Sequence, residues 1–359
     1  MADCRTHLRK ITAQPLLDSV FIANMRDEVD RARYRGMWLP PLGHFNGARL
    51  HCSNTVAQTR VLDCVTEDLL SSYGRKKAKE QFIAATEWAQ DRGAKVVLLA
   101  AALKRLFGED GKALKERFPG LLFTIGDNGT MLLLRNETFR AFDEAGLTPE
   151  TSRIAILGPY GLLGELMTQA LKKRGFNLIG AGPNSAGLNR IADKYGIEVC
   201  PNFEEMGKVD AVVACTHSDK IRLTAEYVEL IRHQDRKLLI IDVAEPSNLM
   251  EEEHLKCRSL VIRQDAGNAY NPKLKYVLGA VTYRMFRLTR GVTFGCFAET
   301  LSLASVISRG DGESMKQIDW FQVNEENIKV VEGLFAREGF NIPSPRCFGK
   351  PVKSFNLAL

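Results

Sequence analysis

The sequence lacks the marks of a membrane or secreted protein. Its longest apolar run, Val96 to Leu103, has 8 residues, whereas a transmembrane helix needs roughly 18. Residues 1–10 mix acidic and basic side chains and lead into no hydrophobic stretch, so no secretory signal is visible. We therefore expect a cytoplasmic protein with no membrane span.

Patterns that hold metal ions or disulfides are missing as well. The chain has 8 cysteines, but none of them forms the Cys-x-x-Cys pair of a zinc ribbon or the dense framework of a small secreted domain. No cluster of His, Asp and Glu shows the spacing of metal ligands. We expect mostly reduced thiols and no metal site.

The bulk composition is that of an ordinary folded protein. At about 150 residues per domain, a length of 359 residues predicts two domains. A content of 45% hydrophobic and 26% charged residues argues against a disordered or collagen-like chain. The formal net charge of +6 favours an acidic partner but is too small to indicate DNA binding.

A change of pattern over residues 146–152 predicts a domain boundary, because a helical pattern stops there and a strand-rich pattern begins. Downstream, short apolar strands alternate with amphipathic helices, which is typical of a parallel sheet covered by helices. The predicted strands are 154–157, 177–181, 197–200, 211–215, 238–243 and 260–262. Helices are predicted over 76–92, 100–107, 136–145, 296–307 and 325–338.

We therefore predict an α/β chain with a Rossmann-like parallel sheet domain and a mixed α/β substrate domain completed by a helical C-terminal tail. The substrate domain spans residues 1–150, the nucleotide-binding domain 151–265 and the tail 266–359. Tails of this kind commonly fold back over the mouth of a nucleotide-type sheet, where ligands bind. We expect this tail to carry the nucleophile and to return to the substrate domain.

The sharpest motif is an apolar strand that runs into Gly158, Gly161 and Gly164 and then into a helix. Glycines at such a turn let the backbone approach a pyrophosphate, and the helix N-terminus offers free N–H groups to the anion. The spacing Gly-x-x-Gly-x-x-Gly indicates dinucleotide binding in this β-α context. We also expect Leu162 in the loop, and Thr216 and Ala244 after two later strands, to contact the cofactor.

The second strand of the sheet is followed by no Asp or Glu that could bind a ribose 2′-hydroxyl, which argues mildly against NAD. Asn184, Ser185 and Arg190 are the candidates for the 2′-phosphate of NADP. A polar loop and a helix cap explain them equally well.

Cys296 is the candidate nucleophile, because a glycine-containing turn meets the first turn of an amphipathic helix at this residue. Helix N-termini favour anions, so we expect the thiol to ionise more easily and to attack a thioester carbonyl. A buried small residue is the alternative. Cys215 is the rival thiol, and His217 is either a proton donor near the nicotinamide or a surface residue.

Several blocks of the sequence resemble the cyanobacterial long-chain acyl-(acyl-carrier-protein) reductases. The glycine loop and the stretch Gly295-Cys296-Phe297-Ala298-Glu299 match the family's motifs, in the same order along the chain. Similar blocks lie at 123–130, 241–248, 323–328 and 336–340. The resemblance covers roughly the last two-thirds of the chain and is that of a distant relative.

This resemblance implies that Cys296 accepts an acyl group from a carrier-protein or CoA thioester and that NADPH reduces it to a free aldehyde. It places Gly126, Asn128 and Thr130 at the substrate, and an aldehyde-consuming enzyme becomes a possible partner. Backbone N–H groups at Cys296 and Phe297 are the expected oxyanion donors. The family carries an arginine where this chain has Gly182, so NADH stays open.

Two other functions stay open. Residues 242–248 also resemble a turn of glutamyl-tRNA reductases, so reduction of an aminoacyl-tRNA or a small carbonyl acid is an alternative, and only this alternative involves tRNA. The other is a non-catalytic dinucleotide-binding protein. Basic clusters at 75–79 and at Arg284, Arg287 and Arg290 could dock an acidic carrier or phosphopantetheine, or be solvated helix faces.

Overall fold

The computed structural model describes residues 3–35 and 43–359 and contains two compact units. The first unit comprises the N-terminal stretch up to residue 130 and residues 269–341. The second comprises residues 131–268 and 342–359. Each unit is built from two separate stretches of the chain.

These limits differ from the predicted boundaries at 150 and 265. Most of helix α5 (Asp127–Ala145) packs in the second unit, where the ring centroids of Phe142 and Phe176 are 5.4 Å apart. The end of the tail also belongs to the second unit, because the Lys237 N–H donates to the Leu357 carbonyl oxygen over 2.7 Å. Only residues 269–341 of the tail return to the first unit.

The first unit contains a six-stranded sheet in the order β13-β2-β3-β1-β4-β5. Strands β1, β3, β4 and β5 run parallel, while β2 is antiparallel to both β3 and β13. The strands are β1 (Ser19–Met25), β2 (His44–Cys52), β3 (Thr55–Val65), β4 (Val96–Leu99), β5 (Leu122–Thr124) and β13 (Leu274–Tyr276).

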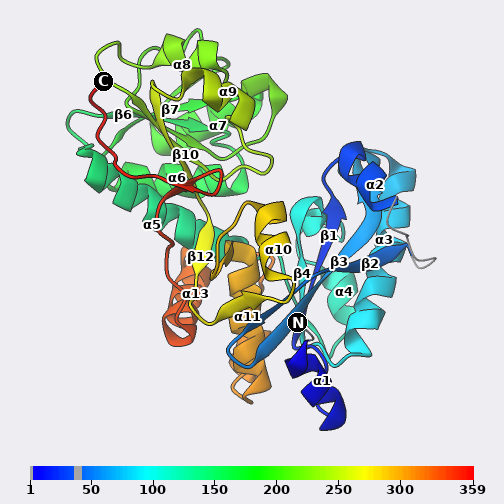
Figure 1. The fold of residues 1–359 in the computed structure, drawn as a ribbon. Helices are drawn as coiled ribbons and strands as arrows, with labels where there is room; N and C mark the ends of the chain where they lie inside the picture. The colour runs from blue at the N-terminus through cyan, green and yellow to red at the C-terminus, as the bar shows by residue number, and fades with distance from the viewer. Residues whose placement is uncertain (1–2, 36–42) are drawn as a thin grey trace. The chain divides into compact units, whose positions relative to one another are not determined.

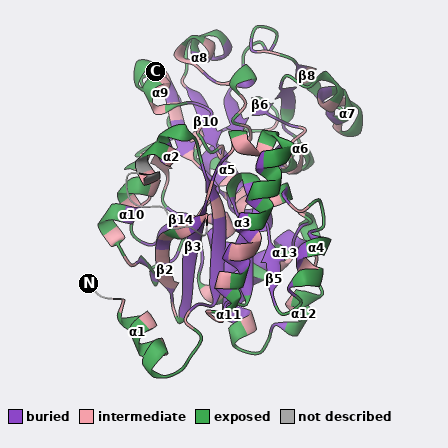
Figure 2. Cartoon of the chain, turned by 90° about the vertical axis from the view of Figure 1, so that its right-hand side faces the viewer, coloured by how far each residue is buried: buried purple, intermediate pink, exposed green. Residues whose placement is uncertain are grey.

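Helices pack on both faces of this sheet. On one face, α3 (Ser72–Gln90) buries Phe82 and Ala85 in the core with Ile22 of β1. On the other, α11 (Gly295–Ser308) stacks Phe297 on Phe21, with ring centroids 4.1 Å apart. Figure 2 shows the resulting pattern, with buried strands and an exposed outer surface on α3.

The remaining elements of the first unit are short or lie outside the sheet. Some belong to the N-terminal stretch of the chain, and the others belong to the stretch that returns to this unit. They are α1 (Cys4–Ile11), α2 (Glu28–Arg35), η1 (Glu67–Leu70), η2 (Ala101–Arg105), α4 (Lys112–Arg117), α10 (Gly279–Phe286), α12 (Glu313–Lys316) and α13 (Glu325–Glu338), with the pair β12 (Asn268–Tyr270) and β14 (Val292–Phe294).

The second unit contains a fully parallel six-stranded sheet in the order β11-β10-β9-β6-β7-β8. The strand that enters first, β6, lies in the middle, and the chain crosses to the other half of the sheet after β8. This is the arrangement of a dinucleotide-binding Rossmann sheet. The predicted α/β fold class is therefore confirmed. The strands are β6 (Arg153–Leu157), β7 (Asn177–Ala181), β8 (Glu198–Cys200), β9 (Ala211–Ala214), β10 (Leu238–Asp242) and β11 (Val261–Asp265).

Helices connect these strands, and the end of the chain adds a small hairpin beside β11 (Figure 1). The connecting helices are α6 (Leu162–Lys173), α7 (Ser185–Tyr195), η3 (Asp219–Ile221), α8 (Ala225–Ile231) and α9 (Glu251–Cys257), and the hairpin is β15 (Arg346–Cys347) with β16 (Lys350–Pro351). No helix in the described part of the chain is long and apolar enough to span a membrane.

The predicted tail helices 296–307 and 325–338 are confirmed as α11 and α13. The tail is nevertheless less helical than predicted, because β12, β13, β14, β15 and β16 all lie in it. These strands have two or three residues each, too few to show a period-2 pattern.

Candidate active site

The glycine loop of the second unit joins β6 to α6, as its sequence predicts. Gly158 has φ +76°, and a Cβ at Gly164 would lie 2.1 Å from the Gly158 carbonyl oxygen, so both positions require glycine. Gly161 is the N-cap of α6 and contributes no side-chain cap. The N–H groups that begin α6, starting with that of Leu162, are therefore available to an anion, and the loop fits a pyrophosphate.

Thr216 and Ala244 lie at the same edge of this sheet as the glycine loop. Thr216 follows β9, and a Cβ added at Gly158 would lie 2.8 Å from the Thr216 Cβ. Ala244 follows β10, and its N–H donates to Asp242 Oδ1 over 3.1 Å. The carboxyl ends of β6, β9 and β10 are where ligands bind in sheets of this order.

The three residues predicted to hold a 2′-phosphate have structural partners. Asn184 caps α7 by accepting the Gly187 N–H over 3.0 Å, and Ser185 is the first residue of that helix. Arg190 is ion-paired with Glu165 over 2.7 Å. Their role as 2′-phosphate ligands stays a prediction.

Tyr160 is a residue of the loop that the sequence analysis did not single out. A Cβ at Gly182 would lie 2.6 Å from the Tyr160 hydroxyl oxygen, and one at Gly187 would lie 2.8 Å from its Cγ. The ring therefore packs on the turn after β7 and on the first turn of α7. This packing explains why glycine stands at 182, where the acyl reductases carry arginine.

In the first unit, Cys296 is the second residue of α11, as predicted. The turn after β5 packs directly on it, because a Cβ at Gly126 would lie 2.3 Å from the Cys296 Cβ. Gly126 has φ +72°, a conformation that favours glycine. The structure thus brings together two residues that lie 170 positions apart in the sequence.

Ionisable side chains that sequence reasoning missed complete this site. Lys104, in η2 after β4, is ion-paired with Asp127, the first residue of α5. Glu299 is fully buried one turn after Cys296 and accepts the Thr124 hydroxyl over 2.5 Å and the Gly129 N–H over 2.7 Å. Glu299 and Asp127 lie inside the sequence blocks that carry the family resemblance, so the sequence could have indicated both as site residues. Lys104 lies in no such block.

The expectation that Cys296 ionises easily is wrong. Burial raises the pKa of its thiol to about 12, although the Lys104 ammonium and the Phe297 N–H act in the opposite direction. The free energy needed to remove the thiolate from water is larger than the stabilisation that the helix N-terminus gives it. Burial also raises the pKa of Glu299 to about 7. Burial alone would lower the pKa of Lys104, but Asp127 and Cys296 hold it above its ordinary value.

Two further predicted substrate residues lie at the start of α5. The Asn128 side chain donates to the Gln322 carbonyl oxygen over 3.2 Å, and its own Oδ1 is buried without a partner among the described residues. The Thr130 hydroxyl donates to the Gly126 carbonyl oxygen over 3.2 Å. Thr130 thus supports the turn that holds Gly126, and Asn128 links the start of α5 to Gln322. Contact of either residue with substrate stays a prediction.

The rival residues Cys215 and His217 lie in the other unit, after β9. Burial raises the pKa of Cys215 to about 12, and Asp242 adds to this rise. His217 is exposed. Within residues 3–35 and 43–359, no group of three or more His, Cys, Asp or Glu side chains is arranged to hold a metal ion.

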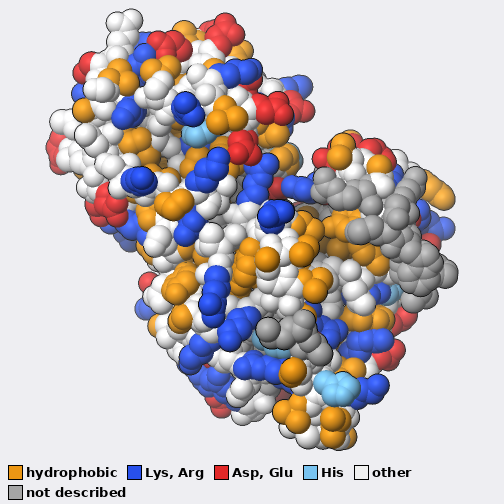
Figure 3. Space-filling model, in the orientation of Figure 1, with side chains coloured by type: hydrophobic (Ala, Val, Ile, Leu, Met, Phe, Trp, Pro, Cys, Tyr) orange, Lys and Arg blue, Asp and Glu red, His pale blue; other side chains and the backbone are white. Residues whose placement is uncertain are grey.

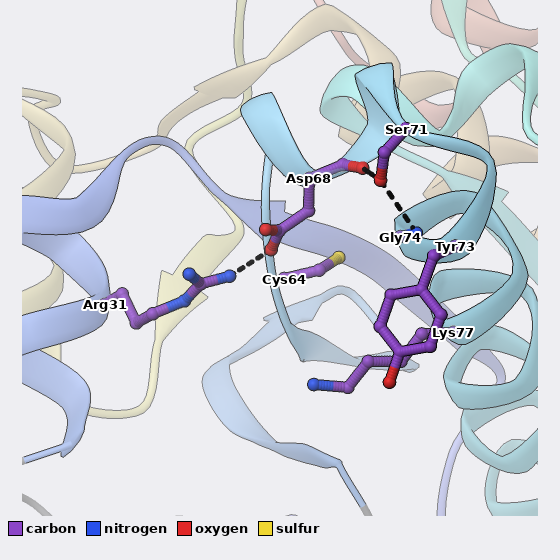
Figure 4. Close-up of a pocket in the computed structure, with 7 residues that line it drawn as sticks. All are labelled: Arg31, Cys64, Asp68, Ser71, Tyr73, Gly74 and Lys77. Carbon is purple, nitrogen blue, oxygen red and sulfur yellow. Dashed lines mark hydrogen bonds and ion pairs between the residues drawn. The ribbon is translucent and has the colours of Figure 1, made fainter.

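A pocket in the first unit involves none of the predicted residues (Figure 4). Two of its charged groups, Arg31 and Asp68, are ion-paired with each other. Burial raises the pKa of its thiol, Cys64, to about 12. The pocket is lined by Arg31, Cys64, Asp68, Ser71, Tyr73, Gly74 and Lys77. We assign it no role.

The chain matches no protein-family model and no curated protein. Among solved structures, L-tryptophan dehydrogenase from Nostoc punctiforme is 12% identical with a TM-score of 0.41, covering 90% of this chain and 89% of that one. Shikimate 5-dehydrogenase from Thermus thermophilus, in complex with NADP(H) and shikimate, is 14% identical with a TM-score of 0.35, covering 89% and 99%.

The nucleotide-binding domain of glutamyl-tRNA reductase from Thermoplasma volcanium is 17% identical with a TM-score of 0.28, covering 36% of this chain and 84% of that one. TM-scores below 0.5 establish no shared fold. The Rossmann assignment of the second unit rests on its strand order, and none of these three structures is an acyl reductase by name.

Proposed function

We propose that this protein is a nicotinamide-dependent oxidoreductase that reduces a thioester-activated acyl group to an aldehyde through an acyl-enzyme on Cys296. The observation that carries the proposal is the set of groups around that thiol. The Lys104 ammonium, the buried Glu299 carboxyl and the Phe297 N–H all affect the pKa of Cys296. The site lies at the carboxyl ends of β4 and β5. Such convergence of ionisable groups is typical of a reactive site.

Acyl transfer begins with loss of the Cys296 proton. Glu299, with a pKa of about 7, is the proposed base because a catalytic base works best when its pKa is near the operating pH. The sulfur then attacks the thioester carbonyl carbon, the new carbon–sulfur bond forms, and the donor leaves as a thiol after taking up the proton. The proton that Cys296 loses to Glu299 is the one that the leaving thiol takes up, so the step needs no other group of the chain.

The carbonyl oxygen becomes negatively charged during the attack and needs donors. The Phe297 N–H already faces the sulfur, which it affects as a hydrogen-bond donor. The Lys104 ammonium, held charged by Asp127, supplies a second donor that the sequence did not suggest. Fixed donors of this kind stabilise an oxyanion without reorganisation.

The second unit is the proposed cofactor site. Gly158, Gly161 and Gly164, with the free N–H groups of α6, fit the pyrophosphate, and Thr216 and Ala244 lie along the same sheet edge. When bound there, NADPH supplies the hydride that reduces the acyl group. Arg190 and Lys194 share the single carboxylate of Glu165, which leaves positive charge near the adenosine end and favours NADPH over NADH.

The proposed donor is an acyl carrier protein or CoA thioester. The three arginines expected on one helix face do not share one, because α10 ends at Phe286 and Arg287 adopts φ +53°. The surface of α10 still combines the exposed apolar residues Val281 and Met285 with Arg284. The basic residues of 75–79 are exposed on α3. Basic and acidic side chains are both spread over the face of the molecule drawn in Figure 3.

Intact mass spectrometry tests the proposal. The protein is incubated without cofactor with medium- and long-chain acyl thioesters of carrier protein and of CoA, and the adduct is mapped by digestion. We expect an acyl adduct on Cys296 that disappears when NADPH is added. Cys296→Ala should abolish it, and Cys215→Ala should leave it unchanged. Labelling only at Cys215, or at no residue, contradicts the proposal.

A further inference from the structure

The α3-covered face of the first unit's sheet holds an arginine that lies in the interior without a counter-charge. Arg60 in β3 is 4% exposed. Its guanidinium donates to His44 Nδ1 over 3.1 Å and to the His44 carbonyl oxygen over 3.2 Å, and it also contacts Asn46 Oδ1. All of these acceptors are neutral, and no carboxylate among the described residues forms an ion pair with Arg60.

A second arginine packs on the same tryptophan ring as the first. The Cζ atoms of Arg60 and Arg92 are each 4.1 Å from the centroid of the Trp88 ring. Arg92 is half-buried and donates to the Trp88 carbonyl oxygen over 3.1 Å, which leaves other N–H groups of its guanidinium without a described partner. The indole ring offers both cations some stabilisation through its π face.

The histidine at this site does not supply the missing negative charge. Burial, together with Arg60 and Arg92, lowers the pKa of His44 to about 4, so the ring is neutral at physiological pH. Burial and Arg92 likewise lower the pKa of Arg60, to about 10, a value at which it stays charged at neutral pH. The cluster therefore carries two positive charges. Arg60 is buried, and a buried charge without a counter-charge is costly. Among the described residues, the half-buried Arg92 has only the Asp91 carboxylate as a nearby negative charge.

We infer that Arg60, Arg92 and Trp88 form a binding site for a phosphate-type oxyanion. Guanidinium forks match the oxygens of phosphate, and a doubly charged anion balances two arginines where a single carboxylate would not. In β1 and β3, Ile22 is in register with Arg60, and Phe21 with Thr59. Arg60 therefore faces α3, whereas Phe21 faces α11 and Cys296, so this site is independent of the proposed acyl chemistry.

Tryptophan fluorescence tests this inference on the full-length protein. We titrate inorganic phosphate at constant ionic strength kept with chloride, and we expect a saturable change in emission. Trp88→Phe should remove the change, which assigns it to Trp88. Arg92→Gln should weaken binding by about tenfold or more, because charge-assisted hydrogen bonds are lost. Lys112→Gln, which removes an exposed charge from α4 of the same unit, should bind like the unmodified protein.

A phosphopantetheine titration distinguishes a phosphate ester from free phosphate as the preferred ligand. Tighter binding of phosphopantetheine identifies an ester site, and tighter binding of inorganic phosphate identifies a free-anion site. Arg92 is half-buried, so Arg92→Gln should fold, and its melting temperature checks this. A signal that follows ionic strength alone, or that persists unchanged in a folded Arg92→Gln protein, overturns the inference.

Discussion

At the scale of single residues, Cys296 is a thiol whose surroundings oppose its charge. Its position in the second place of α11 is what the sequence indicates, but its burial is a property of the packed turn containing Gly126. A motif records which residue types occur, whereas the cost of removing a thiolate from water depends on every neighbour. The sequence can therefore place the thiol at a helix start, but it cannot give the pKa of that thiol.

Lys104 is a residue of the site that the sequence alone does not identify. It follows β4 in a 3₁₀ turn where the sequence predicts an α-helix over 100–107, and no motif includes it. Its importance comes from the parallel arrangement of β4 and β5, which brings the segments after both strands to one edge of the sheet. Asp127 and Glu299, in contrast, lie in blocks that the resemblance already covers.

Alkylation kinetics test the charge environment of the thiol. Iodoacetamide should modify Cys296 slowly at neutral pH, and faster as the pH rises toward its pKa of about 12, because the thiolate is the reactive form. Lys104→Met removes a cation that lowers this pKa, so alkylation should slow by about tenfold for each unit that the pKa rises. The rate is measured by peptide mass spectrometry between about pH 7 and 10.

Lys112→Met is the matched control, since Lys112 is exposed on α4 of the same unit. It should leave the rate unchanged. A rate that does not vary with pH, or that increases in Lys104→Met, is incompatible with the proposed environment.

At the scale of elements, the strands of the second unit are the best-predicted part of the chain. Segments such as Leu238–Asp242 are apolar almost throughout because a parallel sheet is covered on both faces. The strands β2 and β3 escape prediction because polar residues such as Gln58 and Arg60 interrupt the apolar pattern. The burial of these polar residues depends on partners in other elements.

The turn after β10 depends on such a partner. Arg263 of β11 is buried and ion-paired with Asp242 over 2.9 Å, and it also donates to Ser247. Its Cζ lies 4.0 Å from the Phe348 ring centroid in the C-terminal hairpin. We expect Arg263→Met to destabilise the protein by about 3–5 kcal/mol, because the buried Asp242 loses its ion-pair partner.

Urea denaturation measures this effect. Arg258→Met, at the exposed end of α9, is the control and should change the free energy of unfolding by less than about 0.5 kcal/mol. Equal losses in the two variants would show that the buried pair contributes nothing specific.

At the scale of the whole molecule, stability should depend on pH through buried carboxyls. Glu137 in α5 accepts the Gly267 N–H over 2.6 Å, and burial raises its pKa from 4.5 to about 8. The folded protein therefore favours the protonated form. This contribution is fully present below about pH 4.5 and is lost as the pH rises through about 8.

Glu137→Gln should remove this loss while its amide oxygen still accepts the Gly267 N–H. We expect the free energy of unfolding of the variant to fall less between about pH 5 and 8 than that of the unmodified protein. Glu144→Gln, on an exposed part of the same helix, should keep the original pH profile. Identical profiles in all three proteins would contradict the assignment.

The division of each unit into two stretches of chain has a consequence for biosynthesis. When the ribosome has completed β5, the first unit still lacks α11 and therefore one entire cover of its sheet. The second unit in turn awaits the hairpin that shields Arg263. Neither unit can pack fully until its later segment has been translated, so nascent intermediates expose apolar strands. Chaperones that hold such chains therefore become relevant to the yield of this protein.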